Sequence, residues 1–92
     1  MIRSFKDTAT LELYTERKHR DYAGIASVAL RKLDQIEAAT VLLDLKDPPG
    51  NRMEALKGDR SGQYSIRIND QFRICFTWRD DGAYDVEITD YH

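Results

Sequence analysis

The chain has 92 residues, enough for one domain with a modest core and too few for two, so we expect residues 1–92 to form a single domain. Its 14 Lys and Arg against 16 Asp and Glu leave a net charge of −2, which argues against a simple nucleic-acid binder, because such proteins carry a large positive excess. The longest apolar run, residues 41–43, is too short for a membrane span, and the first six residues lack the apolar stretch of a secretory signal. With a single cysteine, Cys75, the chain cannot form an internal disulfide. We therefore expect a cytoplasmic protein without metal or cofactor.

The first half of the sequence predicts a short strand followed by two helices. Residues 1–5 are partly apolar, and Asp7 is placed to cap a helix that starts at Thr8 and ends in the charged run 16–20, where we expect His19 to be exposed. The inward positions of this helix are expected to be Leu11, Tyr14 and Ala9. Inward positions then recur at three- and four-residue steps, which predicts a second, amphipathic helix. They are Ile25, Val28, Ala29, Lys32 or Leu33, Ile36 and Ala39.

Two prolines in a loop at residues 47–51 end the helical half of the chain. After this loop apolar and polar residues alternate, as they do in strands with one buried face. Even-numbered positions are apolar in three successive runs, so one face of the predicted sheet is apolar and the other is polar. The apolar positions are Tyr64, Ile66 and Ile68, then Phe72, Ile74, Phe76 and Trp78, then Tyr84, Val86 and Ile88. We therefore expect an α+β fold in which the helices cover the even face.

Residue parity also predicts the register of these strands, because directly opposite residues of an antiparallel pair lie on the same face. Three-residue loops at 69–71 and at 80–82, the latter with Gly82 in a left-handed conformation, keep the two faces separate. The expected pairs are Ile68 with Phe72, Ile66 with Ile74, Arg67 with Arg73, Trp78 with Tyr84, Phe76 with Val86, Ile74 with Ile88 and Phe72 with Asp90. This register brings the last three residues of the chain beside Arg73.

Positive charge is concentrated in the middle of the chain. Residues 51–79 carry six basic and three acidic side chains, whereas residues 80–92 carry five acidic and no Lys or Arg. Within the basic segment, the predicted pairing sets Arg67 against Arg73, and two opposed like charges destabilise a sheet unless something neutralises them. A phosphate group would do so, because arginine recognises its oxygens in a forked geometry. An ordinary ion pair of Arg73 with Glu87, its diagonal neighbour, would serve equally, and both interpretations stay open.

Metal-independent cleavage of RNA requires a base for the 2′-hydroxyl, a cation for the developing phosphorane charge and an acid for the departing 5′-oxygen. Side chains of the right types are Glu54, Lys57, Arg73 and the terminal His92. Structural explanations stand beside these roles, because Glu54 and Lys57 could form a charged connector and His92 a solvated chain end. Cys75 is either a packing residue or a thiol near the site.

The order of several motifs resembles that of the HigB-type toxins, also called plasmid-maintenance killer proteins, of the RelE/ParE superfamily. These motifs are LKGD at 56–59, GQYSIRIN at 62–69, QFRICF at 71–76 and YDVEITDYH at 84–92. The run PPGNR at 48–52, together with Glu54, is similar to the GraT branch. The resemblance implies a RelE-like β-α-α-β-β-β fold and a type II toxin that cleaves messenger RNA on the ribosome, by attack of the 2′-hydroxyl on the adjacent phosphate.

The resemblance also implies roles for individual residues. Those that match the family's catalytic set are Lys57 and Arg73 as phosphate-stabilising cations and Asp90, Tyr91 and His92 as the carboxy-terminal group. The further expected RNA contacts are Arg52, Arg60 and Arg67. Many HigB proteins have a histidine where this chain has Glu54. Because a glutamate has a reference pKa of about 4.3, we expect Glu54 to act as a base or as an orienting group.

The implied partners are an antitoxin of the helix-turn-helix HigA type, operator DNA reached only through that antitoxin, and a ribosome with message in its decoding site. Two alternatives belong to other classes of function. One is a toxin similar to ParE that binds gyrase and is not a nuclease, and the terminal Asp90, Tyr91 and His92 argue against it. The other is a degenerate toxin that acts only as an antitoxin-binding co-regulator, which Glu54 leaves open.

Overall fold

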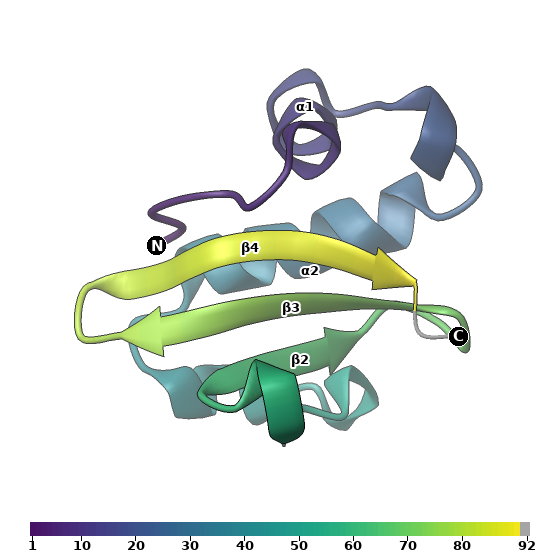
Figure 1. Ribbon diagram of the computed structural model, residues 1–92. Coiled ribbons are helices and arrows are strands. Elements are labelled where there is room, and N and C mark those ends of the chain that lie inside the picture. The colour runs from purple at the N-terminus through teal and green to yellow at the C-terminus, as the bar shows by residue number, and fades with distance from the viewer. Residues whose placement is uncertain (91–92) are drawn as a thin grey trace.

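The computed structural model describes residues 1–90 as two helices packed on one face of an antiparallel sheet, which confirms the predicted α+β fold (Figure 1). The helices are α1 (Thr8–Glu16) and α2 (Ala26–Ala38), and the strands are β1 (Glu54–Ala55), β2 (Gln63–Arg67), β3 (Phe72–Arg79) and β4 (Gly82–Asp90). Short 3-10 helices lie in the connections, namely η1 (Arg20–Tyr22), η2 (Leu42–Lys46), η3 (Pro49–Asn51) and η4 (Gly58–Arg60). The strands lie in the order β1-β2-β3-β4, and α2 runs behind the sheet in Figure 1.

Helix α1 begins where the sequence predicts, but it buries a different face. The Asp7 carboxylate accepts a hydrogen bond from the backbone N–H of Thr10 at 3.3 Å and caps the helix. Thr10 and Leu13 are fully buried, whereas Leu11, expected inside, is 41% exposed. The reason is a tertiary hydrogen bond, because the Thr10 hydroxyl accepts from the backbone N–H of Ile88 in β4 at 3.0 Å. The partly buried positions are Ala9 and Tyr14.

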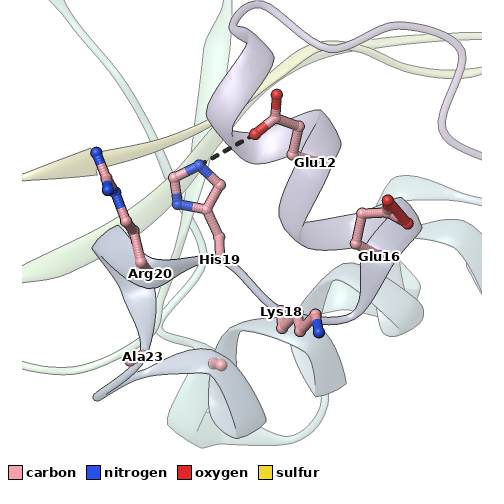
Figure 2. A pocket seen from close by; sticks show the side chains of 7 residues that line it. Glu12, Glu16, Lys18, His19, Arg20 and Ala23 are labelled. Carbon is pink, nitrogen blue, oxygen red and sulfur yellow. Dashed lines mark ion pairs between the residues drawn. The ribbon is translucent and has the colours of Figure 1, made fainter.

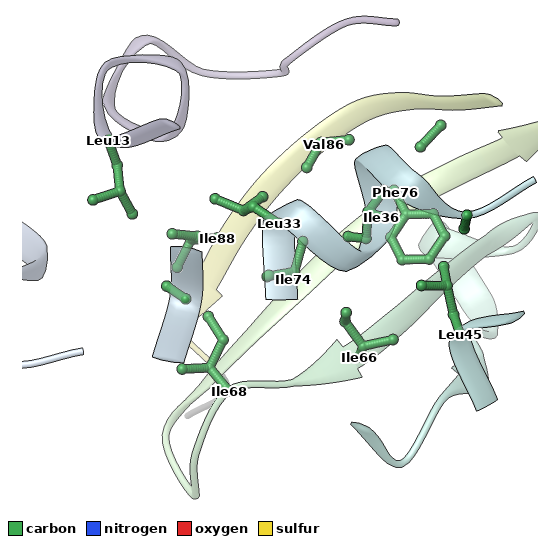
Figure 3. Close-up of a cluster of buried hydrophobic side chains, with 13 residues drawn as sticks. Leu13, Leu33, Ile36, Leu45, Ile66, Ile68, Ile74, Phe76, Val86 and Ile88 are labelled. Atoms are coloured by element: carbon green, nitrogen blue, oxygen red, sulfur yellow. The ribbon is translucent and has the colours of Figure 1, made fainter. Parts of the chain in front are cut away.

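Helix α2 and the apolar core agree with the sequence prediction. The buried residues of α2 are Ala29, Lys32, Leu33 and Ile36. Ala29, Leu33 and Ile36 pack on the even-numbered sheet residues Ile66, Ile68, Ile74, Phe76, Val86 and Ile88 (Figure 3). Leu13 from α1 and Leu45 from η2 join the same cluster. Burial of this apolar surface is the main force that holds the helices on the sheet.

The β2–β3 hairpin has the predicted register. Its pairs include Ile66 with Ile74 and Arg67 with Arg73. The backbone N–H of Ile68 donates to the carbonyl oxygen of Phe72 at 3.0 Å, which closes the three-residue loop. The β3–β4 pair also has the predicted register at the end away from its turn, with Ile74 opposite Ile88, Arg73 opposite Thr89 and Phe72 opposite Asp90.

The β3–β4 hairpin departs from the predicted register near its turn. A β-bulge places two residues of β4, Asp85 and Val86, opposite Phe76, so Trp78 faces Ala83 instead of Tyr84. Asp85 has a positive φ of 54°, which this irregularity requires. The predicted pairs beyond the bulge are therefore wrong, and the alternation of side chains misses it because a bulge shifts parity by one residue.

Gly82 pairs with Arg79, so the turn has two residues, 80 and 81, rather than the predicted three. The backbone of Gly82 has a φ of 137°. A Cβ added there would lie 2.1 Å from the carbonyl oxygen of Met1. The position therefore requires glycine because of close backbone packing as well as its conformation.

The first residues of the chain run parallel to β4 without forming a continuous strand. The two isolated bridges join Ile2 to Ala83 and Phe5 to Val86. Between them, at the bulge, the backbone N–H of Asp85 donates to the Ser4 hydroxyl at 2.8 Å. The bulge thus explains why the strand predicted at residues 1–5 is interrupted, and the segment covers the outer edge of β4.

Candidate active site

Helix α2 covers one face of the sheet (Figure 1), and the predicted residues Arg67 and Arg73 lie on the opposite face. Cross-strand pairing forms two adjacent rows of odd-numbered side chains on this face. They are Arg67, Arg73 and Thr89 in one row and Ser65, Cys75 and Glu87 in the next. Because directly opposed side chains in a sheet lie about 4.5–5.5 Å apart at Cβ, these rows bring residues of three strands within reach of one ligand.

Arg73, on β3, is held in place by groups from β2 and from the edge strand β1. Its side chain is only 14% exposed, and its Nη1 lies 3.0 Å from Oε1 of Glu54. The same Nη1 donates to the hydroxyl of Ser65 at 3.2 Å. Glu54 reaches Arg73 because β1 pairs with β2, with Glu54 opposite Ser65. The sequence predicts Glu54 and Arg73 as site residues without predicting a contact between them, and the pairing of β1 with β2 brings the two side chains together.

Each of the two opposed arginines has a carboxylate partner within the chain. Arg73 has Glu54, and Arg67 forms an ion pair with Asp70 in the following loop. The Asp70 side chain is 97% exposed, and exposed ion pairs of this kind stabilise a protein by less than about 1 kcal/mol. An incoming phosphate could therefore displace Asp70 from Arg67 at little cost.

Glu87 has a different role from the one considered at the sequence level. Its carboxylate lies 3.3 Å from Nη1 of Arg60 and 3.5 Å from Nζ of Lys6. Its side chain is mostly buried, and it draws both cations toward the sheet face. The sequence analysis did not name Lys6, because its contact with Glu87 joins residues that are far apart in the chain. Cys75 is buried between the flanking strands and acts as a packing residue.

Three more of the predicted residues lie in the connections on either side of β1 and at the end of β4. Lys57 is exposed and precedes η4, and Arg52 is exposed and follows η3 with a φ of 44°. Neither forms an ion pair with a carboxylate among residues 1–90. Oδ2 of Asp90 accepts a hydrogen bond from Nε2 of Gln71 at 3.0 Å at the end of β4. The remaining two predicted residues, Tyr91 and His92, lie outside the described residues.

This arrangement is suited to binding a phosphodiester. A guanidinium fixed by a hydroxyl and a carboxylate can stabilise developing negative charge without first being oriented, and the neighbouring carboxylate is a group that accepts protons. Within residues 1–90, no group of three or more His, Cys, Asp or Glu side chains is placed to hold a metal ion. None of the helices in this same range is both long and apolar enough to cross a membrane.

A cleft of about 820 Å³ lies elsewhere, between the end of α1 and the start of α2 (Figure 2). His19 lines it, and its side chain is only 15% exposed, which contradicts the expectation that this residue is solvent-exposed. Its Nε2 lies 3.2 Å from Oε2 of Glu12, and its Nδ1 accepts a hydrogen bond from the N–H of Asp21 at 3.1 Å. His19 therefore joins α1 to η1.

Comparison with known proteins identifies the family. Residues 3–92 match the model of a family described as the RelE-like toxin of the type II toxin-antitoxin system HigB. The chain belongs to the HigB-like toxin family. This HigB-like toxin is 40% identical over 82 residues to the Vibrio cholerae protein Toxin HigB-1, a match that covers 87% of this chain and 86% of the relative. It is 31% identical to the Proteus vulgaris protein Endoribonuclease HigB over the full length of both.

Solved structures share the fold of this HigB-like toxin. The YoeB-YefM complex from Staphylococcus aureus matches 100% of this chain and 98% of the other, with a TM-score of 0.63 and 18% sequence identity. The structure of YafQ from E. coli matches 99% of this chain and 92% of the other, with a TM-score of 0.60 and 13% identity. These likenesses confirm the RelE-like architecture predicted from the sequence motifs.

Proposed function

We propose that this HigB-like toxin is an endoribonuclease that cuts messenger RNA on the ribosome. The observation that carries the proposal is the Arg73 guanidinium, held 3.0 Å from Glu54 on the open sheet face and directly opposite Arg67. The name of the Proteus vulgaris relative, an endoribonuclease, supports the same activity. A fixed cation beside a carboxylate provides two of the three groups that metal-independent RNA cleavage needs.

In the proposed reaction the 2′-oxygen attacks the adjacent phosphorus while the bond from phosphorus to the 5′-oxygen breaks, leaving a 2′,3′-cyclic phosphate and a 5′-hydroxyl. Arg73 stabilises the charge on the phosphorane oxygens, with Lys57 as a second cation. Glu54 accepts the 2′-proton or orients the group that does. The residues assigned to the carboxy-terminal group, which includes the donor of a proton to the 5′-oxygen, are Asp90, Tyr91 and His92.

Carboxylate pairing on this face favours a substrate that the ribosome presents. The pairs are Arg73 with Glu54, Arg67 with Asp70, and Arg60 with Glu87. Free RNA would have to displace these carboxylates, and a chain of net charge −2 attracts RNA weakly from solution. A ribosome that aligns the message removes most of this entropic and electrostatic cost. Activity on ribosomes places the toxin in the cytoplasm.

The test is a purified translation system in which cleavage of ribosome-bound message is mapped for wild type, Arg73→Ala and Glu54→Gln. We expect Arg73→Ala to lower the cleavage rate by at least about 10²-fold, the usual effect of removing a group that stabilises the transition state. Arg79→Ala is the matched control, because Arg79 lies on the same strand and is exposed beyond the bulge. An Arg73→Ala toxin that cleaves as fast as Arg79→Ala would refute the proposed site.

Naked RNA provides a second test of the same proposal. At physiological salt we expect the wild-type toxin to degrade deproteinised message far more slowly than ribosome-bound message, because nothing then aligns the phosphodiester with Arg73. Efficient degradation of naked RNA would contradict the requirement for the ribosome while leaving the nuclease assignment intact.

We also propose that the partner of this toxin is a helix-turn-helix antitoxin of the HigA type, which alone carries the pair to operator DNA. The family description, a toxin of a toxin-antitoxin system, and the antitoxin complex among the structural neighbours support an antitoxin partner. Co-expression with a HigA-type protein should yield a stable complex in size-exclusion chromatography. Its binding to operator DNA should be lost when the antitoxin is omitted.

A further inference from the structure

A buried lysine lies outside the site described above. Lys32, on α2, is 5% exposed, and its Nζ donates to Oδ1 of Asn51 at 2.8 Å. Burial lowers the pKa of the Lys32 ammonium, and the nearby charges of Arg31 and Arg67 lower it further. Burial of an ammonium group costs free energy that burial of an apolar side chain of similar size does not. Core packing alone therefore gives no reason for a lysine here.

Asn51 links three separate elements through one buried side chain. Its Nδ2 donates to Oε1 of Gln35 on α2 at 3.0 Å and to the backbone carbonyl oxygen of Leu45 in η2 at 3.1 Å, while its Oδ1 accepts from Lys32. Asn51 itself is the last residue of η3 and is fully buried. We call Lys32, Gln35 and Asn51 the latch. Every hydrogen bond within it joins the 49–51 segment to the helical layer.

The segment that the latch anchors leads directly to the candidate active site. Arg52 follows Asn51, and Glu54 begins β1 two residues later. Strand β1 has only two residues and lies at the edge of the sheet, with the N–H of Leu56 donating to the carbonyl oxygen of Gln63 at 2.9 Å beyond it. So short an edge strand is held weakly by its own pairing. The position of Glu54 therefore depends on where the chain leaves Asn51.

We propose that Lys32 and Asn51 are positioning residues for RNA cleavage, because they fix the start of β1 and so hold the Glu54 carboxylate against Arg73. The proposal rests on the proposed nuclease function and adds to it two residues that do not touch the substrate. Both are buried on the helical side of the sheet, whereas Glu54 is 47% exposed on the other side. Their effect on the reaction must therefore pass through the backbone of residues 51–54.

The experiment compares Lys32→Met with Arg31→Met, which removes the same charge from the adjacent, exposed position of α2. Three quantities are measured for each: the single-turnover rate on ribosome-bound message, the hydrogen exchange of the Leu56 amide, and the urea midpoint of unfolding. For Lys32→Met we expect a rate about tenfold lower, since a small misplacement of a reacting group slows catalysis by this order or more. We also expect faster exchange at Leu56 and a lower urea midpoint, because the buried Oδ1 of Asn51 loses its donor. Arg31→Met should match wild type in all three.

Combining the change with Glu54→Gln distinguishes positioning from a general effect on folding. If the latch acts through the Glu54 carboxylate, Lys32→Met together with Glu54→Gln cleaves no more slowly than Glu54→Gln alone. If the two rate losses multiply, the proposal is overturned. Gln35→Leu, which removes a single outer hydrogen bond of the latch, serves the same comparison if Lys32→Met does not fold.

The remaining outcomes separate this inference from the function on which it rests. A wild-type toxin that cuts message, beside a Lys32→Met toxin with the same rate and the same Leu56 exchange, overturns the latch and leaves the nuclease intact. A wild-type toxin that cuts no message overturns the nuclease. In that case the Leu56 exchange still reports whether Lys32 holds β1.

Discussion

Replacing Thr10 with valine tests the hydrogen bond that joins α1 to β4. Valine has almost the same shape as threonine but cannot accept a hydrogen bond, so the backbone N–H of Ile88, now 3.0 Å from Oγ1, would be left buried without an acceptor. An unsatisfied buried donor costs about 1–3 kcal/mol, and threonine and valine have nearly equal helix propensities. We therefore expect Thr10→Val to lower the free energy of unfolding by about 1–3 kcal/mol. In a chain of this size each 1 kcal/mol lowers Tm by about 4–8 °C.

Urea and thermal unfolding, followed by circular dichroism, measure this change. Thr15→Val is the matched control, since Thr15 lies on the exposed side of the same helix, and its hydroxyl donates only to the carbonyl oxygens of Leu11 and Glu12 in its own helix. We expect Thr15→Val to change stability by less than about 0.5 kcal/mol, and Thr10→Ser, which keeps the hydroxyl, to be more stable than Thr10→Val. Equal urea midpoints for Thr10→Val and Thr15→Val would show that the hydrogen bond is not what buries Thr10.

Three further changes test other parts of the fold. Gly82→Ala should lower the free energy of unfolding by more than about 3 kcal/mol, because the new Cβ would meet the Met1 carbonyl oxygen at a positive φ, whereas Gly50→Ala, with open space around it, should leave Tm unchanged or raise it. Phe76→Ala empties the centre of the core and should lower the urea-derived free energy of unfolding by about 3–5 kcal/mol. Hydrogen bonds from the preceding turn lower the pKa of Asp44 below its ordinary value of 3.8, so their stabilisation is present above that pH and is lost as pH falls through the lowered pKa. The fall in Tm between about pH 5 and pH 2 should accordingly be smaller for Asp44→Asn than for wild type.

The part of the candidate site that could be predicted from the sequence is the part on β2 and β3, where polar and apolar side chains alternate. Arg67 and Arg73 were placed opposite each other because side chains alternate with a period of two, and two apolar pairs fix that register. Glu54 could be named only by its chemistry and by the resemblance, because β1 has two residues and no alternation to read. Its contact with Arg73 depends on pairing between β1 and β2, which no local pattern encodes. The same holds for Glu87, which pairs with cations from Lys6 and η4.

Residue patterns along the chain are enough to predict the α+β class, the amphipathic face of α2, the apolar face of the sheet and the register of β2 against β3. These features follow from periodicity, since burial of an apolar stripe requires side chains at repeating intervals along a single element. The buried face of α1, the position of the bulge in β4 and the buried partner of Lys32 become visible only in the folded chain. Each of these depends on a hydrogen bond between elements that are far apart in the sequence, such as the bond from the Ile88 N–H to the Thr10 hydroxyl. Contacts of this kind leave no periodic pattern in the sequence.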